Sequence, residues 1–311
     1  MKNYAIARIV AWSIVTAICF GVLFAGLSGR MDLFSFPELN FDIRMGYGYS
    51  NSDKYTVGGG SVAAKDIQSV EINWISGSVD VVPYDGDTIQ FDEEGYDGVD
   101  EKYAMRYLVE NGKLSIRFFA PQRRRNWRSL QQYRKSLMVK IPRDLALNDF
   151  KLNAVSGGIQ LEGVRAGDLD INSVSGSINL KDINGDTIIL KSVSGHIDAV
   201  DISASTLRAN TVSGRIDVTA GVESANLNTV SGSVKLYTGE DTRNINVKTI
   251  SGGITLGLPE NDGFTARYSS VSGGFNSEFP VEMSGKRGVY KNGDGNISFE
   301  TISGGMKIVR R

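Results

Sequence analysis

The sequence predicts an all-β protein, a β-solenoid of stacked coils of about 19 residues that is preceded by a single transmembrane helix. Three observations predict this fold. A Val/Ile-Ser-Gly motif recurs nine times, apolar and polar residues alternate on both sides of each motif, and residues 9–27 carry no charge. A short motif at nearly constant spacing is typical of folds in which one supersecondary unit stacks on the next.

The motif serines are evenly spaced over the second half of the chain. From Ser156 to Ser272 they lie 19, 19, 19, 18, 20 and 21 residues apart. A unit of this size cannot cover its own apolar face, so the units must stack, with a rise of about 4.8 Å per coil. We assign the motif glycines as structural corners: Gly77, Gly157, Gly176, Gly195, Gly214, Gly232, Gly252, Gly273 and Gly304.

Each motif joins two short amphipathic strands. Residues six and four before the serine, and three and five after it, are apolar in almost every copy, as in Leu169, Ile171, Ile178 and Leu180 around Ser175. The Val or Ile before the serine breaks this alternation, so we expect a bend or bulge there. Glycine suits it because it can take positive φ or let a neighbouring backbone approach closely. We expect the serine hydroxyl to bond an amide of the turn.

The N-terminal segment has the properties of a membrane anchor. Residues 9–27 would form a helix of about 28 Å, close to the roughly 30 Å hydrocarbon core of a bilayer. Lys2 and Arg8 precede the run, which favours a short cytoplasmic tail at residues 1–8, a single-pass location in the cell membrane and an extracytoplasmic solenoid. A cleaved signal peptide, with Gly26 and Ser28 near the cleavage site, is the alternative.

The remaining segments connect the anchor to the repeats. Residues 28–60 are polar and glycine-rich and predict a mostly flexible stalk. Residues 61–149 hold the first motif, a hairpin signal at Asn111-Gly112 and a strand over 136–142, and we expect them to form an N-terminal coil, a hairpin and a cap over the open edge of the stack. Residues 150–311 carry the solenoid repeats, with a second hairpin expected at 290–296.

Charge is segregated in one region only. The net charge of −1 predicts no general attraction to nucleic acid, which is not expected as a partner. Residues 85–101 hold eight carboxylates, whose spacing fits a solvated loop better than a Ca²⁺ loop. A basic segment follows, and it could contact a polyanion or the membrane, although it could also pair with the acidic stretch or face water. Its residues are Arg123, Arg124, Arg125, Trp127, Arg128, Arg134 and Lys135.

The chain shows no pattern typical of catalysis or of metal binding. The repeated serines have no recurring His-carboxylate partner, the only histidine, His196, lies beside a corner, and the only cysteine, Cys19, lies in the apolar run. We therefore expect no catalytic residues, no cofactor and no metal. Asp198 and Asp217 would be neighbours in the stack, about 4.8 Å apart, and such a pair could serve a retaining glycosidase.

The Val-Ser-Gly-x-Ile-x-Leu coils, the Val-Lys-Ile-Pro strand at 139–142 and the N-terminal apolar segment resemble the bacterial "putative adhesin" family of β-strand repeats over residues 60–311. The resemblance implies a β-solenoid at the cell envelope and no catalytic residues. We expect a non-enzymatic, membrane-anchored surface module that acts as an adhesin-like binding or scaffold domain for a cell-wall polymer, glycan or envelope protein. A polysaccharide-active enzyme using Asp198 and Asp217, and an envelope-stress sensor working through a partner protein, are the alternatives.

Overall fold

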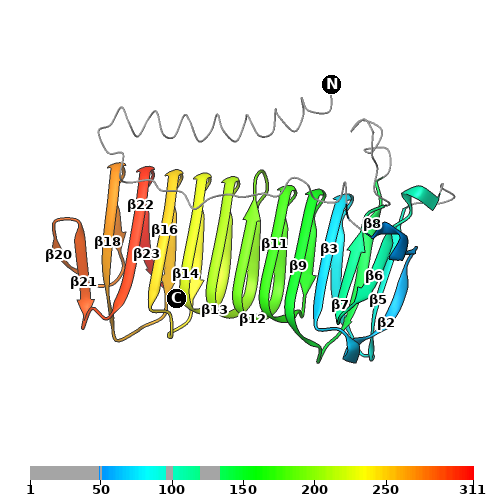
Figure 1. Cartoon of the computed structure of the whole chain (residues 1–311). Coiled ribbons are helices and arrows are strands. Elements are labelled where there is room, and N and C mark those ends of the chain that lie inside the picture. Colours follow the sequence, from blue (N-terminus) through cyan, green and yellow to red (C-terminus); the bar gives the residue numbers. More distant parts are fainter. Residues whose placement is uncertain (1–48, 50, 96–100, 120–133) are drawn as a thin grey trace, which may run out of the picture.

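The computed structural model of the chain describes residues 49, 51–95, 101–119 and 134–311. The predicted membrane segment, residues 9–27, lies outside the described residues. Within the described part, no helix is both long enough and apolar enough to cross a bilayer. The strands stand side by side in one elongated stack (Figure 1).

The strands fall into four groups along the chain. The N-terminal section contains β1 (Thr56–Val57), β2 (Gly60–Ala63), β3 (Ser69–Ser76), β4 (Val79–Tyr84), β5 (Thr88–Glu94), β6 (Arg106–Glu110), β7 (Lys113–Arg117) and β8 (Ser136–Pro142). The regular coils are built from β9 (Ala146–Ser156), β10 (Ile159–Glu162), β11 (Arg165–Ser175), β12 (Ile178–Ser192), β13 (Ile197–Ser213) and β14 (Ile216–Ser231). The next coils use β15 (Val234–Thr238), β16 (Asn244–Ser251), β17 (Ile254–Leu258), β18 (Gly263–Ser272) and β19 (Phe275–Ser277). The chain ends with β20 (Glu282–Ser284), β21 (Arg287–Lys291), β22 (Gly295–Ser303) and β23 (Met306–Arg310).

Neighbouring coils pair in parallel and in phase, so that each motif lies on the next. Ser175 pairs with Ser156, and Ser213 pairs with Ser231, which in turn pairs with Ser251. The apolar columns predicted from the sequence point inward and are buried along the whole stack. The prediction of an all-β stack of coils is therefore confirmed. The only members of these apolar columns that are partly rather than fully buried are Tyr268, Phe275 and Ser277, and all three belong to one coil.

That coil lies at one end of the stack because the coils do not stack in sequence order. The last motif, on β22 and β23, is inserted between the two motifs that precede it in the sequence: β22 pairs with β16 on one side and with β18 on the other. The β18–β19 coil is thus the terminal one, and Tyr268 stacks on Phe275 there with ring centroids 4.8 Å apart. The expectation that consecutive repeats are always neighbours is wrong at this end.

The chain reaches the inserted position by way of an antiparallel cover strand. β20 and β21 form a hairpin, and β21 pairs antiparallel with the outer edge of β18. β22 then pairs with the opposite edge of the same strand. The turn at 292–294 therefore carries the chain across β18, and the second hairpin expected at 290–296 is not formed.

The N-terminal section contributes a further coil that lacks the motif. β3 pairs directly with β9 in phase, Ser76 on Ser156, although 80 residues separate the two serines. On the other side of β3 and β4, the strands β7 and β8 pair with them in parallel as one more coil. β6 then covers β7, and β5 covers β8, both antiparallel. Antiparallel strands therefore end the stack and protect its open edge.

Residues 51–60 belong to this cover and not to a flexible stalk. β1 pairs with β6, and β2 pairs with β5. Gly59 is packed so closely that a Cβ atom there would lie 2.7 Å from the carbonyl oxygen of Phe91. Gly59 therefore serves close packing against β5, and Gly60 lies against Tyr107 of β6. The rest of the predicted stalk, residues 28–48, lies outside the described residues.

The motif glycines allow the corners of adjacent coils to touch backbone to backbone. At Gly195, a Cβ would lie 2.6 Å from the carbonyl carbon of Gly176 and closer still to its oxygen. The other motif glycines make the same approach to their neighbours. Positive φ is an additional requirement at some corners, such as Gly157 with φ 127°. Close approach is therefore the requirement that all corners share, and positive φ is not needed at every one.

The hydroxyls of the motif serines do not bond the amides of the corner in the described chain, contrary to the expectation from the sequence. From Ser156 to Ser303 they are exposed, while the corner amides bond between coils, as Gly214 N–H does to the carbonyl of Ser231 at 3.1 Å. The hydroxyl that reaches the corner stands two residues before the motif serine: Thr211 and Thr229 donate to the carbonyls of Gly195 and Gly214, both at 3.2 Å. These two corners are thus satisfied between coils, whereas in the terminal coil the hydroxyl of Ser270 donates to the carbonyl of Gly273 within the same coil at 2.8 Å.

A ladder of buried asparagines, which the sequence analysis missed, also ties the coils together. Asn172 donates to the side-chain oxygen of Asn153 at 3.0 Å, and Asn153 donates to that of Asn73 at 2.9 Å. Asn228 and Asn210 repeat the contact at 2.8 Å. All five stand three residues before a motif serine, and that recurrence was visible in the sequence. Lys191 occupies the same position between the two parts of the ladder.

Replacing Asn153 by alanine is expected to lower the free energy of unfolding by about 2 kcal/mol. The change leaves a buried acceptor on Asn73 without its donor and a buried donor on Asn172 without its acceptor. Asn179→Ala, on the exposed side of β12, is the matched control and should change stability by less than about 0.5 kcal/mol. Chemical denaturation measures both, and equal values for the two variants would contradict the ladder's role.

Candidate binding surface

The outward side of the long strands carries rows of mostly polar side chains that run along the axis of the stack. One row stands five residues before the motif serines and, by strand register, passes in order through Asp170, Ile189, Arg208, Asn226, Asn246, Ser298 and Arg267. A second row, seven residues before the serines, passes through Asp168, Thr187, Thr206, Ser224, Asn244 and Asn296. Inter-coil register therefore aligns residues that are far apart in the sequence.

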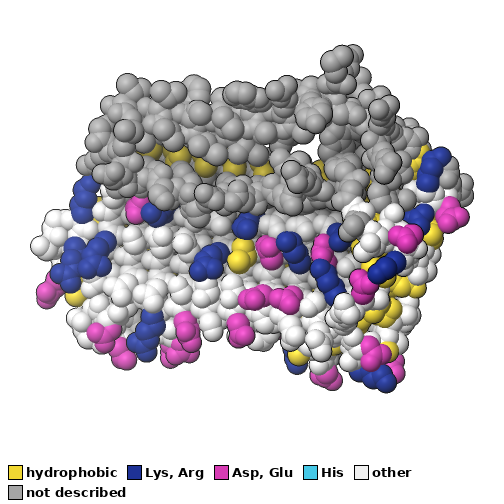
Figure 2. Space-filling model, in the orientation of Figure 1, with side chains coloured by type: hydrophobic (Ala, Val, Ile, Leu, Met, Phe, Trp, Pro, Cys, Tyr) yellow, Lys and Arg dark blue, Asp and Glu magenta, His cyan; other side chains and the backbone are white. Residues whose placement is uncertain are grey.

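The distribution of charge differs between the two halves of these rows. Toward the N-terminal end the rows carry charges of both signs, Asp149, Asp168 and Asp170 together with Lys151, whereas Arg208 and Arg267 are the charged residues of the first row farther along. Between the two arginines the surface is uncharged, and Figure 2 shows it as a white area between dark-blue groups. We name this area the amide face and define it by six residues: Ser224, Asn226, Asn244, Asn246, Asn296 and Ser298.

The amide face lines a shallow hollow of about 560 Å³, with Arg267 at one side. A neighbouring hollow of about 1350 Å³ shares Ser224 and Asn244 with it. Among the six side chains of the face, only Asn226 bonds another side chain of the described chain, accepting from Asn228 at 2.9 Å. The remaining amide and hydroxyl groups are therefore available to a ligand.

Two arginines stand directly opposite each other at the end of the amide face. Arg267 on β18 and Arg287 on β21 are register partners, and both are exposed. Neither forms an ion pair with an acidic residue of the described chain. Like charges opposite each other on adjacent strands destabilise a sheet. This pair therefore raises the local positive potential at a cost in stability.

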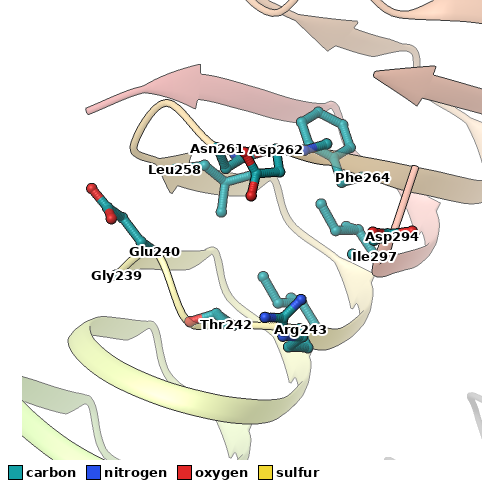
Figure 3. Close-up of a pocket in the computed structure, with 13 residues that line it drawn as sticks. Gly239, Glu240, Thr242, Arg243, Leu258, Asn261, Asp262, Phe264, Asp294 and Ile297 are labelled. Carbon is teal, nitrogen blue, oxygen red and sulfur yellow. Dashed lines mark hydrogen bonds between the residues drawn. The ribbon is translucent and has the colours of Figure 1, made fainter. Parts of the chain in front are cut away.

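A second pocket, of about 620 Å³, lies where the loops after β15, β17 and β21 meet. Arg243 and Thr242 lie on one side of it, with Asn261 and Asp262 across from them (Figure 3). Glu240, Asp262 and Asp294 also line it, so negative charges outnumber the single guanidinium. Among the described residues, no group of three or more His, Cys, Asp and Glu side chains could hold a metal ion. The pocket is thus mixed in charge, unlike the amide face.

The predicted basic contact segment is only partly visible. Arg123, Arg124, Arg125, Trp127 and Arg128 lie outside the described residues, and Arg134 is exposed. Lys135 is buried, with a relative exposure of 1%. It therefore has no surface to offer a polyanion or a membrane, and its assignment to the contact segment is corrected.

Lys135 occupies the corner of the coil that lacks the motif. Its ammonium donates to the backbone oxygens of Phe118 at 2.5 Å and Tyr103 at 2.6 Å, and it is paired with the carboxylate of Glu93. Its own carbonyl accepts from the indole of Trp74 at 2.9 Å. One side chain thereby joins β5, the residue that follows β7 and the short 3-10 helix Glu101–Tyr103. The acidic stretch and the basic segment meet here, through Lys135 and Glu93. Asp85 of the acidic stretch pairs instead with Arg143, which lies beyond the basic segment, at 2.9 Å.

The stability of this corner should depend on pH. Burial lowers the pKa of Lys135 to about 8, against the opposing effect of Glu93. Between pH 8 and the unfolded value of about 10.5 the unfolded chain binds more protons, so this group's contribution to stability rises with pH. We expect the stability of the wild type relative to Lys135→Met to increase across this window, on the order of 3 kcal/mol in total. Urea denaturation at pH 7, 9 and 10 measures it, and a constant difference would contradict the shift.

The two aspartates considered for glycoside hydrolysis and the only histidine all lie in the described part of the chain. Asp198 and Asp217 are register partners, as predicted. Asp198 is bound by the guanidinium of Arg215 at 3.0 Å, a partner that the sequence did not indicate. His196 is exposed beside its corner, and its Nδ1 accepts the backbone N–H of Arg215 at 3.1 Å. One of the two carboxylates, that of Asp198, is therefore engaged in an ion pair at the surface.

Comparison with known proteins gives one family match. A family model described as Toastrack DUF4097 matches residues 67–309 of the chain. No curated protein sequence matches this chain significantly.

Several solved structures are also similar. A "putative cell adhesion protein" from Clostridium sporogenes shares 11% identity, with 83% of this chain and 100% of that chain covered and a TM-score of 0.29. A "putative adhesin" from Bacteroides fragilis shares 11% identity, with 81% and 97% covered and a TM-score of 0.48. A "putative lipid binding protein" from Parabacteroides distasonis shares 15% identity, with 81% and 96% covered and a TM-score of 0.45.

Proposed function

This chain belongs to the Toastrack DUF4097 family, and from that premise we propose that it is a non-enzymatic binding or scaffold module of the cell envelope. The observation that carries the proposal is the amide face. It is a regular polar surface with unengaged hydrogen-bonding groups, held on strands that pair with both neighbouring coils. Such a surface recognises a ligand by position and needs no reactive group.

The repeated features of the chain support a non-enzymatic role. The motif glycines have a structural reason at every corner, since each packs against its neighbour. The exposed motif serines recur without a histidine or carboxylate partner among the described residues. A serine nucleophile is commonly activated by such a partner acting as a general base. The serine rows are thus better explained as part of the polar surface than as reactive groups.

We further propose that residues 9–27 anchor the chain in the cell membrane with residues 1–8 in the cytoplasm and the solenoid outside. The support is the uncharged 19-residue run and the positive charges that precede it. An anchored solenoid would hold the amide face close to envelope polymers and proteins.

The orientation can be tested by cysteine labelling in intact cells. Cys19 is the only natural cysteine, so an introduced cysteine reports its own position. Asn179→Cys, at an exposed site of β12, should react with a membrane-impermeant maleimide in whole cells. Lys2→Cys in full-length protein should react only after lysis. Labelling of residue 2 and not of residue 179 in intact cells would overturn the proposed orientation.

The binding role is tested with the full-length chain in detergent micelles. It is offered cell-wall polymers, acidic and neutral glycans and envelope protein extracts, and both retention and turnover are measured. Saturable binding without any change in the ligand is the expected result. Turnover of a glycan that is lost in Asp198→Asn/Asp217→Asn would instead show an enzyme, and the absence of all binding would remove the binding role.

A further inference from the structure

We propose that the amide face and the arginines beside it bind a linear, hydroxyl-bearing anionic polymer that lies along the axis of the stack. The polymer is a glycan or polyol chain that carries carboxylate or phosphate groups. This inference rests on the proposed binding function and assigns that function a surface and a class of ligand.

The arginines define the charge of the ligand. Arg208 and the Arg267/Arg287 pair flank the amide face, and all three side chains are exposed. Within the described chain none of them forms an ion pair. A guanidinium binds carboxylate or phosphate through two parallel hydrogen bonds, which makes arginine the preferred residue for such groups. Positive charge that is concentrated at a cost in stability is best explained by an anionic ligand.

The spacing of the arginines defines the direction of the ligand. Register places Arg208 four coils from Arg267, which corresponds to about 19 Å, and Arg287 one strand farther, at about 24 Å. The intervening rows run across the strands, parallel to the axis of the stack. A single extended chain in this direction would contact both charged positions and pass over the hollow between them.

The amide face defines what lies between the charges. Its four asparagines offer both donors and acceptors, and its two serines offer hydroxyls. These groups repeat at about 4.8 Å in each row, and hydroxyls along a polymer match them. Among the residues that the structure describes, no aromatic side chain lines this hollow. Affinity for a neutral glycan by stacking on a ring is therefore not provided here, so charge is needed for binding.

The acidic residues of the preceding coils define where the site ends. Asp170 and Asp168 stand two coils beyond Arg208 in the two rows. They would repel an anionic chain that continued past Arg208. Lys151 follows Asp170 in the first row, so charges of both signs lie beyond Arg208, and arginines combined only with uncharged polar groups are confined to the coils of β13, β14, β16, β22 and β18.

The test compares two double variants of the full-length chain that remove the same charge. Arg267→Gln/Arg287→Gln removes the pair at the end of the face. Lys140→Gln/Lys235→Gln removes two exposed lysines of β8 and β15 that lie off the amide face. The probes are polygalacturonate for carboxylate, poly(glycerol phosphate) for phosphate and dextran as the neutral polymer.

We expect the arginine variant to bind at least one anionic probe at least tenfold more weakly than the wild type does, and the lysine variant to stay within twofold. The anionic probe with the higher affinity identifies the charged group. Dextran should not bind. The arginine variant should unfold at an equal or higher temperature, because a repulsive pair has been removed. Equal affinities of the two variants would overturn the inference.

A second comparison tests the amide face itself. Asn226→Ala/Asn246→Ala should weaken binding of the hydroxyl-bearing anionic probe several-fold and leave binding of inorganic polyphosphate, which lacks hydroxyls, unchanged. An equal loss for both would show that the asparagines act through the fold and would overturn their assigned role.

The failure of this inference can be distinguished from failure of the proposed function. Arginine-dependent binding to phosphatidylglycerol vesicles, without binding to any polymer, would make the ligand a membrane surface and overturn the inference. Binding of an envelope polymer or protein that is insensitive to all these variants would leave the binding function standing at another surface.

Discussion

Replacing Lys135 by methionine is expected to lower the free energy of unfolding at pH 7 by about 3 to 5 kcal/mol. Methionine fills much of the same volume but donates no hydrogen bond. The change leaves the backbone oxygens of Phe118 and Tyr103 without their donor and leaves Glu93, only 11% exposed, without its cation. Removing one partner of a buried pair is costly because the other charge stays desolvated.

The effect should spread beyond the pair because Lys135 joins strands that are far apart in the sequence. Its ammonium lies 4.4 Å from the ring centroid of Phe118 and 5.3 Å from that of Trp74. Those two rings pack edge to face in the core of the first coils, with their centroids 4.8 Å apart. Loss of the ammonium therefore weakens the cap as well as one ion pair, and hydrogen exchange should rise first in β5 and β7.

A double-mutant cycle distinguishes loss of the Lys135–Glu93 ion pair from a general loss of stability. Lys135→Met/Glu93→Gln should be less destabilised than the sum of the two single variants, because each removes the unpaired charge that the other creates. Arg134→Met, an exposed neighbour, is the matched control and should change stability by less than about 0.5 kcal/mol. Additive effects in the cycle, or a Lys135→Met loss below 1 kcal/mol, would show that the ammonium does not hold the cap.

Replacing Gly195 by alanine is expected to lower the free energy of unfolding by about 3 kcal/mol. The added methyl group would overlap the backbone of Gly176, which is fixed by the pairing of β11, β12 and β13. The corner cannot move aside without breaking hydrogen bonds to coils on both sides. Strain in φ is not the reason, since Gly195 is not among the residues with positive φ.

Gly158 provides the matched control. It follows a motif glycine directly, has no positive φ, and a Cβ there would meet no atom within 4 Å. Gly158→Ala should therefore leave stability within about 0.5 kcal/mol of the wild type. Thermal and urea denaturation measure the stability of both variants. A neutral Gly195→Ala variant would mean that the coils do not approach each other as closely as described.

The distribution of buried and exposed residues within each coil could be predicted from the sequence. Period-two alternation around Ser175 or Ser213 identifies the inward side chains, because a strand with one buried face leaves no other pattern. The motif also identifies the corner glycines, and the resemblance to a family of β-strand repeats is consistent with the family match. The recurrence of asparagine three residues before the motif serine also indicated the buried asparagine ladder, although the sequence analysis missed this pattern.

The candidate surface could be predicted only in part. Register in a run of similar repeats places Asn226 beside Asn246, so the middle of the amide face follows from the spacing of the motifs. The neighbours Ser298 and Arg267 do not follow, because β22 is inserted ahead of β18. Nor does the opposition of Arg267 and Arg287, which depends on an antiparallel strand that carries no motif.

The sequence by itself determined the repeat, the inward columns and the residues at the corners, because these depend on local alternation and on the steric needs of a bend. The tertiary structure alone decided the order of the coils at both ends, the burial of Lys135 and the assembly of the arginines beside the amide face. Strand edges of similar repeats offer nearly equivalent hydrogen bonds, so the choice between them depends on which arrangement covers the exposed ends of the stack. That choice is a property of the whole chain and leaves no local pattern in the sequence.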